Sequence, residues 1–170
     1  MQLSRFTDYS LRVLIYAAAR SDTGTGKTRL GPAMVRAGHR PAVSHGTDDR
    51  CTVSEVAELF QISRDHLVKV VHGLQTLGYL TTRRGRGGGF DLARPAAQIG
   101  IGQVVRDTEG HFDLVECLGG VHCRLLPVCV LKGALQGALA AFFEKLDGYT
   151  LADMIRQPTR VRAALALPVV

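Results

Sequence analysis

The fold can be inferred from residues 52–92, TVSEVAELFQISRDHLVKVVHGLQTLGYLTTRRGRGGGFDL. Apolar residues recur at helical spacing over residues 52–60, with Glu55 in the first turn, where a negative charge suits the helix dipole. After a tight turn, Ser63 is placed to cap a second helix that runs to about residue 77. The residues that carry these two periods are Val53, Val56, Ala57 and Phe60, and then Leu67, Val70, Val71 and Leu74.

The second of these helices has basic residues on the side opposite its apolar face. Two amphipathic helices joined by a short turn are typical of a helix-turn-helix, whose second helix reads DNA. A strand-like run (79–83), the loop RGRGGG (84–89) and a second short strand (90–93) then predict a β-hairpin wing. Its glycine-rich tip can approach a DNA backbone closely. The candidate DNA-contacting residues are Ser63, Arg64, His66, Lys69, Arg84 and Arg86.

The alternative for each piece is purely structural. A helical pair is often only packed core, and an Arg/Gly loop is often only a solvated turn. Their immediate succession, with basic residues on the exposed side of the second helix, favours a winged helix. The fold class expected is therefore mainly α with a small β-wing: a winged helix-turn-helix DNA-binding domain followed by a long C-terminal dimerisation helix.

Outside this unit, residues 7–20 show a helical period, with Thr7 or Asp8 placed to cap it. Residues 21–50 are rich in glycine and small polar residues and predict a flexible insertion. The DNA-binding domain is thus expected to span residues 1–95.

The second half of the chain begins with a short helix expected from about Ile99 to Gly110. The longest helical pattern runs from Val130 to Leu146, with apolar residues at heptad-like spacing, and favours a dimerisation helix, because helix-turn-helix readers commonly bind two half-sites. An intramolecular core helix is the alternative. A cysteine-bearing loop and this helix make up residues 96–155, and residues 156–170 are expected to form a tail with little order. The stripe consists of Leu131, Leu135, Ala138, Leu139, Phe142 and Leu146.

Charge is unevenly distributed along the chain. The net charge is +6, which favours an anionic partner. Residues 1–50 carry eight basic and four acidic side chains, residues 61–94 six and two, and residues 95–147 four and six. A basic half followed by an acidic half that bears cysteines indicates a nucleic-acid reader joined to a sensor.

No apolar run approaches the roughly 20 residues of a membrane span, and no signal peptide is evident. We therefore expect a soluble, cytoplasmic protein without a membrane partner. In a reducing cytosol, clustered cysteines are more often metal ligands or redox groups than disulfides.

Three of the four cysteines, Cys117, Cys123 and Cys129, are separated by five residues each time, in a glycine- and proline-containing loop. Zinc sites usually draw on closer pairs, whereas an iron–sulfur cluster accepts wider spacing. Three thiolates leave one iron position open, and His122 is a weak candidate for it. The fourth cysteine, Cys51, is interpreted as a partly buried small residue.

Two alternatives remain open at this point. One is a winged-helix regulator that senses zinc or thiol oxidation with these cysteines, and the other is an iron–sulfur redox protein. No arrangement of side chains typical of an enzyme active site appears, so no enzymatic activity is expected.

Several motifs together resemble the IscR/NsrR family of dimeric iron–sulfur winged-helix regulators, and its nitric-oxide-sensing branch most closely. These motifs are MQLSRFTDYSLRVLIY (1–16), SRDHLVK (63–69), RGRGGG (84–89), the three spaced cysteines and LDGYTLAD (146–153). The resemblance implies a homodimeric repressor that binds a palindromic operator in double-stranded DNA and releases it when nitric oxide attacks the cluster.

The resemblance also implies a ligand set. A 4Fe-4S cluster would be held by Cys117, Cys123 and Cys129, with an aspartate from the first helix of the other subunit, a position matched by Asp8. In the IscR branch a histidine three residues after the last cysteine completes a 2Fe-2S site, and Lys132 stands there. This difference favours the nitric-oxide-sensing branch, with 2Fe-2S as the alternative cluster. The 21–50 insertion departs from the family pattern.

Overall fold

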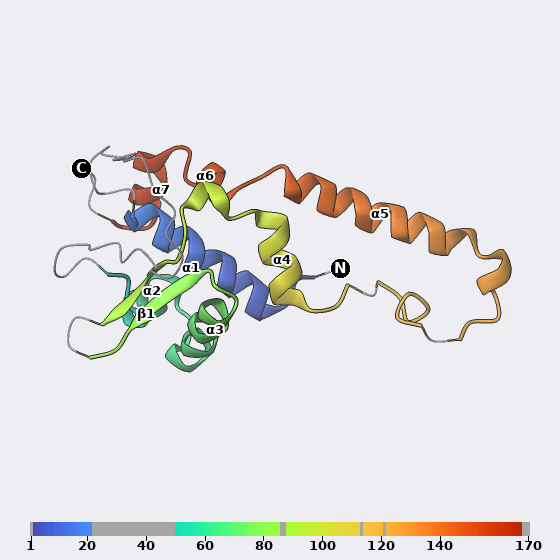
Figure 1. Ribbon diagram of the computed structural model, residues 1–170, viewed down its shortest axis with the longest axis horizontal. Helices are drawn as coiled ribbons and strands as arrows, with labels where there is room; N and C mark the ends of the chain where they lie inside the picture. Colours follow the sequence, from blue (N-terminus) through green and yellow to red (C-terminus); the bar gives the residue numbers. More distant parts are fainter. Residues whose placement is uncertain (1, 22–49, 86–87, 113, 121, 168–170) are drawn as a thin grey trace, which may run out of the picture.

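The computed structural model describes residues 2–21, 50–85, 88–112, 114–120 and 122–167. Most of the predicted insertion (21–50) and Arg86 lie outside these ranges. The elements, in chain order, are α1 (Arg5–Ser21), α2 (Val53–Phe60), α3 (Arg64–Thr76), β1 (Leu80–Arg83), β2 (Gly89–Leu92), η1 (Ala96–Gln98), α4 (Ile101–Glu109), η2 (Leu126–Val128), α5 (Val130–Asp147), α6 (Leu151–Met154) and α7 (Pro158–Ala164) (Figure 1).

Helix α1 begins two residues earlier than its apolar period predicts. Ser4 caps it, since its Oγ accepts the Thr7 N–H at 3.2 Å and its carbonyl accepts the Asp8 N–H at 3.0 Å. The expectation that Thr7 or Asp8 is the cap is therefore wrong. Apolar periodicity cannot locate a first turn that has little apolar surface, and Ser4 is as good a capping residue as either.

Helices α2 and α3 confirm the predicted pair. Thr52 caps α2 in a reciprocal box, in which its Oγ1 accepts the Glu55 N–H at 3.2 Å and the Glu55 carboxylate accepts the Thr52 N–H at 2.7 Å. Gln61 turns the chain with a left-handed backbone (φ 53°). Ser63 then caps α3, its Oγ accepting the His66 N–H at 3.3 Å.

The predicted wing is confirmed as an antiparallel hairpin, with a register that runs from Leu80↔Leu92 to Arg83↔Gly89. Two hydrogen bonds between the backbones of Cys51 and Phe90, of 3.2 and 2.8 Å, join the chain before α2 to the wing. Cys51 is only 2% exposed, so it is buried more completely than the partly buried small residue that the sequence predicts.

The core lies where α1 packs against α3, α4 and the wing. Its buried apolar residues come from α1, α2, α3, β1, β2 and α4 and from the segments that join them, together with Leu151 of α6. The largest of the fully buried side chains are Tyr79, Phe90, Leu14, Leu67, Leu74 and Leu80.

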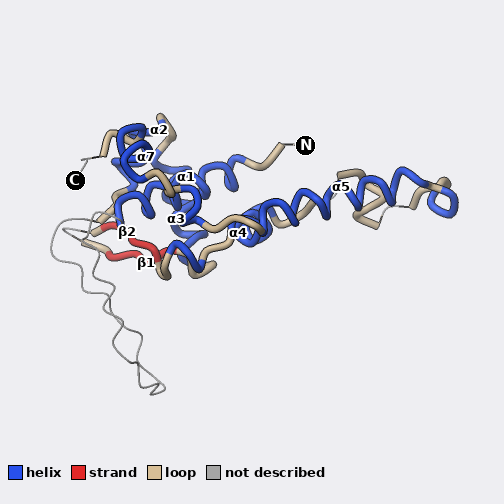
Figure 2. The backbone as a smooth tube through the Cα atoms, turned by 90° about the horizontal axis from the view of Figure 1, so that it is seen from above, coloured by secondary structure: helices blue, strands red, loops and turns tan. Residues whose placement is uncertain are grey.

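Helix α5 differs from the other long helices. It extends away from the body, and the segment 110–129 lies alongside its far end (Figures 1 and 2). None of its residues is buried within the chain. The predicted helix from Val130 to Leu146 is thus confirmed. Its apolar side chains are half-buried or exposed in the part of the chain that the structure describes, and Phe142, Phe143 and Leu146 near its C-terminal end pack against the core.

The expectation of little order after residue 155 is wrong for the described part of that segment. Residues Pro158–Ala164 form α7, which contacts α1, and the Arg162 side chain on it is only 5% exposed. Pro158 starts this helix rather than preventing it, because proline is favoured in a first helical turn.

A separate finding concerns membranes. Over the part of the chain that the structure describes, no helix has both the length and the apolar character required to cross a bilayer.

Candidate nucleic-acid interface and candidate metal centre

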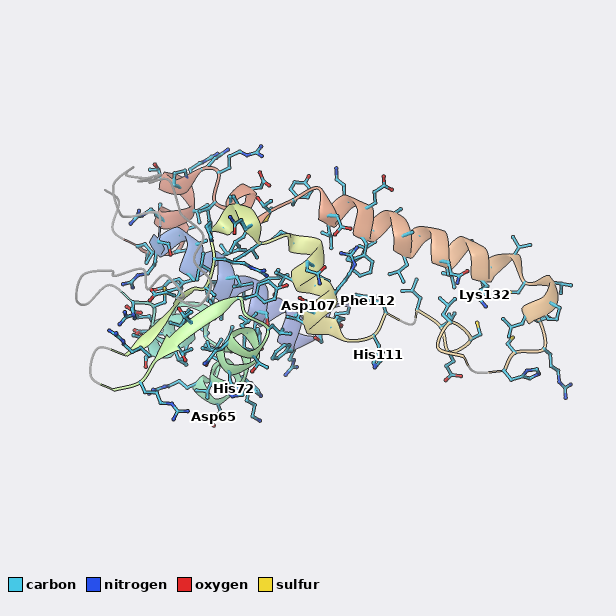
Figure 3. All side chains as sticks on the ribbon, in the orientation of Figure 1. Asp65, His72, Asp107, His111, Phe112 and Lys132 are labelled. Carbon is cyan, nitrogen blue, oxygen red and sulfur yellow. The ribbon has the colours of Figure 1, made fainter. Side chains whose placement is uncertain are left out.

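Helix α3 presents a continuous exposed face opposite its core face. At about 100° per residue, Leu67, Val70, Val71 and Leu74 fall on one side of the helix. Exposed residues fill the other side, where Asp65 and His72 project from α3 at the outer edge of the helical body (Figure 3). The full exposed set of α3 is Arg64, Asp65, His66, Val68, Lys69, His72, Gln75 and Thr76.

Four predicted DNA-contacting residues are described on α3 and its cap, and they are not equivalent. Arg64 and Lys69 are exposed on the outer face. His66 is exposed at the edge nearest α1, with its ring centroid 6.4 Å from that of Tyr9. The Ser63 hydroxyl already accepts a backbone N–H as the helix cap, so it contributes to helix geometry first.

A groove of about 450 Å³ lies between α3 and the wing. Its apolar lining comes from Val53, Val68 and Val71, and its polar lining from His72, Gln75, Thr82 and Arg84. The wing is tied to α3 here, because the Thr82 hydroxyl donates to Gln75 Oε1 at 2.8 Å.

Of the residues that line this groove, the sequence predicts only Arg84 as a DNA-contacting residue, and it does not single out Val68, His72, Gln75 or Thr82. Helical geometry alone would have identified Val68, because its position around the axis of α3 falls among basic and polar residues rather than on the apolar face. The contact between Thr82 and Gln75 depends on how the wing folds back and has no local signal.

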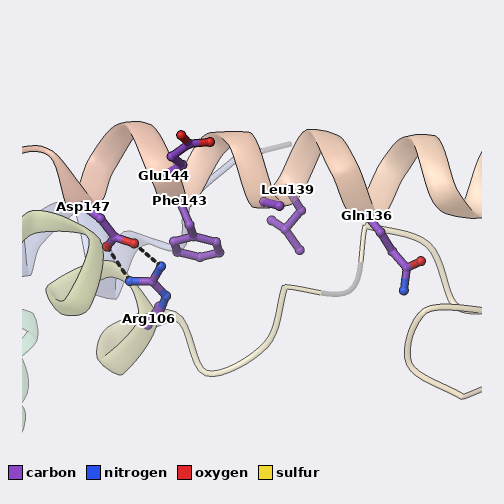
Figure 4. Close-up of a pocket in the computed structure, with 7 residues that line it drawn as sticks. Arg106, Gln136, Leu139, Phe143, Glu144 and Asp147 are labelled. Atoms are coloured by element: carbon purple, nitrogen blue, oxygen red, sulfur yellow. Dashed lines mark hydrogen bonds and ion pairs between the residues drawn. The ribbon is translucent and has the colours of Figure 1, made fainter.

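Helix α4 connects this DNA-facing unit to α5. The buried Tyr79, at the root of the wing, donates its phenolic hydrogen to Asp107 Oδ2 at 2.5 Å. Burial and this hydrogen bond raise the pKa of Tyr79 well above its usual value. On the same helix, Arg106 makes two hydrogen bonds of 2.6 Å with the Asp147 carboxylate and stacks 4.2 Å from the Phe143 ring centroid (Figure 4).

The three clustered cysteines lie on the segment between α4 and α5. All are free and half-buried; Cys117 lies in a turned stretch, Cys123 precedes η2 and Cys129 is the N-cap residue of α5. Three accessible free thiols are soft donors that suit iron–sulfur chemistry. Among the described residues, however, no three His, Cys, Asp or Glu side chains gather closely enough to hold a metal ion. A single chain thus supplies the donors without assembling all three sulfurs.

Asp8 lies in the first turn of α1, with its side chain 45% exposed. Its carboxylate accepts hydrogen bonds from Arg12, at 3.0 Å from Nε and 2.9 Å from Nη2. A metal would therefore compete with Arg12 for this carboxylate. His122 is exposed, and Lys132 lies in the first turn of α5 (Figure 3).

Taken together, the helix-turn-helix, the hairpin wing and the exposed basic face of α3 define a winged-helix DNA-binding protein. Residues 42–157 match the Rrf2 family, described as "Iron-dependent Transcriptional regulator". The chain belongs to this family.

The chain is also similar to curated relatives over nearly its whole length. It is 38% identical to the HTH-type transcriptional regulator NsrR of Bacillus licheniformis, covering 98% of this chain and 100% of that protein. Identity to the NsrR of Geobacillus kaustophilus is 39%, covering 97% of each. The chain is therefore a transcriptional regulator of the Rrf2/NsrR family. These relatives are named as regulators, which agrees with the expectation that the chain is not an enzyme.

Solved structures show the same fold at lower identity. The T. potens IscR structure matches with a TM-score of 0.64 and 20% identity, covering 95% of this chain and 91% of that one. The global cysteine regulator CymR of B. subtilis matches with a TM-score of 0.58 and 21% identity, covering 91% and 95%. The expected fold class, a winged-helix regulator with a long helix outside the DNA-binding unit, is confirmed.

Proposed function

We propose that the chain is a homodimeric repressor that binds a palindromic operator and releases it when nitric oxide reacts with an iron–sulfur cluster. The observation that carries this proposal is the set of three free, half-buried thiols on the segment leading into an uncovered helix, in a chain whose first half is a winged helix. Similarity to proteins named NsrR supports the same reading.

The cluster would be held by Cys117, Cys123 and Cys129, with Asp8 of the partner subunit as the fourth ligand. A cluster held by thiolates and one hard carboxylate offers small reactive ligands an iron position that is easily displaced. The 4Fe-4S form is proposed first, with 2Fe-2S as the alternative. In this ligand set the three cysteines come from one chain and Asp8 comes from a second, so a second chain would complete it.

The dimer would form through α5. Leu131 is 62% exposed, and no residue of α5 is buried in the described structure, so a partner would cover the part of its apolar stripe that stays exposed. Two-fold symmetry would then place two copies of α3 on successive half-sites of a palindrome.

On DNA, the residues we assign to contacts are Arg64 and Lys69 on the outer face of α3, Arg84 and Arg86 on the wing, and His66 at the edge nearest α1. Ser63 would act mainly by holding the first turn of α3. The basic side chains can reach phosphates as well as base edges. This assignment keeps residues 1–95 as the DNA-binding domain and residues 96–155 as the sensing and dimerising part.

The test is an anaerobic preparation of the full chain. We expect a brown protein with about four irons per chain, a visible absorbance bleached by nitric oxide, and operator binding that is lost with it. A colourless protein that holds one zinc, or that loses DNA only on thiol oxidation, would instead support the alternative sensor. A brown protein that does not bind DNA would support the alternative of an iron–sulfur redox protein.

Variants sharpen this test. Alanine at Cys117, Cys123 or Cys129 should abolish the cluster, whereas Cys51→Ala, the matched control at a buried cysteine outside the segment, should retain it. Asp8→Ala should keep the iron but change its spectrum or its response to nitric oxide. An Asp8→Ala protein identical to the parent in both would remove Asp8 from the ligand set.

A further inference from the structure

Val68 is an apolar side chain placed on the DNA-facing side of α3. Its side chain is 54% exposed, whereas the core valines of the same helix, Val70 and Val71, are buried. Its neighbours one helical turn away in each direction are Arg64 and His72, both exposed. Val68 therefore does not belong to the core face and interrupts a polar surface.

The surroundings of Val68 form a shaped site rather than a flat surface. Val53 and Val71 continue its apolar surface within the groove between α3 and the wing. Gln75, held by the Thr82 hydroxyl at 2.8 Å, and Arg84 supply polar groups in the same groove. The hydrogen bond occupies the Gln75 carbonyl oxygen, which leaves its amide nitrogen to donate.

A single exposed valine would need no explanation on an ordinary surface. On this face it is flanked by Arg64, Lys69 and Arg84, the charges expected to meet phosphates. In the major groove of DNA the one apolar group that a base presents is the C5-methyl of thymine, and small apolar side chains contact it. Charge complementarity thus favours DNA as the occupant, and the chemistry of the side chain selects the base.

We propose that Val68 is a specificity-determining residue that contacts the C5-methyl group of one thymine in each half-site. This inference rests on the proposed operator binding and deepens it, because it names a base and a group on that base. Arg64 and Lys69 then supply affinity, and Val68 supplies discrimination between thymine and the other bases at one position.

The probe is a duplex selected by the wild-type chain from a random-sequence pool, in which each thymine is replaced in turn by deoxyuridine. This change deletes one methyl group and keeps the base pair. At one position of a half-site we expect roughly fourfold weaker binding, since a buried methyl group contributes about 0.8 kcal/mol. Deoxyuridine at thymines outside the half-sites should have no effect.

The variant Val68→Ala should bind the thymine duplex roughly fourfold or more weakly and should lose its sensitivity to deoxyuridine at that position. Val68→Thr, which keeps the branched shape and one methyl group, should show an intermediate sensitivity. Leu77→Ala is the matched control, because it truncates an exposed apolar side chain at the C-cap of α3, on the side of the helix axis opposite Val68. It should retain the wild-type pattern.

The proposal is overturned if Val68→Ala keeps the full deoxyuridine effect at every thymine, or if no thymine in the half-sites is sensitive in the wild type. A shift from dimer to monomer in Val68→Ala, measured by sedimentation, would also overturn it, because Val68 would then face a second copy of the chain. If the wild-type chain selects no duplex at all, the proposed operator binding is itself wrong. This outcome is distinct from those that overturn only the role of Val68.

Discussion

Glu109, at the last residue of α4, joins two parts of the chain that are far apart in sequence. Its carboxylate accepts the Ser4 N–H at 2.9 and 3.1 Å, the Ser4 hydroxyl at 3.0 Å and the Thr7 hydroxyl. It therefore adds a negative charge and several acceptors to the first turn of α1, where backbone N–H groups lack helical partners. The cysteine-bearing segment begins at the next residue, so Glu109 lies between that segment and the turn that carries Asp8.

Replacing Glu109 with glutamine should destabilise the fold by about 1–3 kcal/mol, because an amide nitrogen would face donors that now meet a charged acceptor. Urea unfolding measures this change, and hydrogen exchange should show faster opening of residues 5–8 in particular. Glu58→Gln, at an exposed glutamate of α2, is the control and should change stability little. Equal stability of the Glu109 and Glu58 variants would mean that the contacts with Ser4 and Thr7 contribute nothing.

At the scale of elements, the junction between α4 and α5 fixes the direction in which α5 leaves the body. Arg106 pairs with Asp147, and Phe143 packs edge-on against Phe112 with ring centroids 4.6 Å apart. Gly102 lies against Asp147 so closely that a Cβ there would be 2.0 Å from its Oδ1. These contacts all lie near the C-terminal end of α5, so the rest of the helix is held through this junction.

The Arg106–Asp147 pair predicts a pH dependence. The hydrogen bonds from Arg106 hold the pKa of Asp147 below its usual value, so the ionised form stabilises the folded junction. This contribution is present above pH 4 and is lost as the pH falls through the lowered pKa. Asp147→Asn should therefore lower the Tm at pH 7, and the difference from wild type should shrink as the pH falls below 4.

Thermal unfolding followed by circular dichroism at pH 7, 5 and 3 makes this comparison. Glu144→Gln, which alters an exposed carboxylate three residues before Asp147 on α5, is the matched control and should show no such convergence. A difference in Tm between Asp147→Asn and wild type that stays constant down to pH 3 would show that the pair is electrostatically unimportant.

The elements that could be predicted from the sequence are those with local signals. The period of α2 and α3, the cap at Ser63 and the glycines of the wing are all encoded within a few residues, and the structure agrees with them. Helix α7 was missed because a seven-residue helix with one proline has little periodicity. It packs against α1, and this tertiary contact has no signal in the local sequence.

The candidate site divides in the same way. Arg64 and Lys69 could be placed on the exposed face because helical geometry alone fixes them. The hydrogen bond between Gln75 and Thr82 depends on how the wing folds back on α3, and Glu109 binds Ser4 from 105 residues away, so neither contact leaves a local pattern in the sequence. The prediction that the three cysteines converge on one cluster is of a third kind. It concerns the cluster-bound dimer rather than the single chain.

At the scale of the whole molecule, α5 projects from the body that the winged-helix unit forms (Figure 2). Helix α5 is 18 residues long, and the described residues of the chain cover its stripe only in part: Leu131 is exposed, and Leu135 and Leu139 are half-buried. A second copy is the partner that would close this surface by symmetry and bring another Asp8 toward the cysteine-bearing segment. A substitution that prevents dimer formation through α5 is then expected to abolish cluster binding and to weaken operator binding as well.

Leu139→Lys tests this connection, because it places a charge in the middle of the stripe, where burial would remove its hydration. We expect a monomer by sedimentation, loss of iron, and binding to a palindromic duplex weakened by at least tenfold, since each half-site would be bound separately. Ala141→Lys adds the same charge on the opposite side of α5, where Ala141 is exposed, and should remain dimeric. If Leu139→Lys sediments as a dimer that still holds iron, the two chains associate through a different surface, and the route from the cysteines to α3 does not pass through α5.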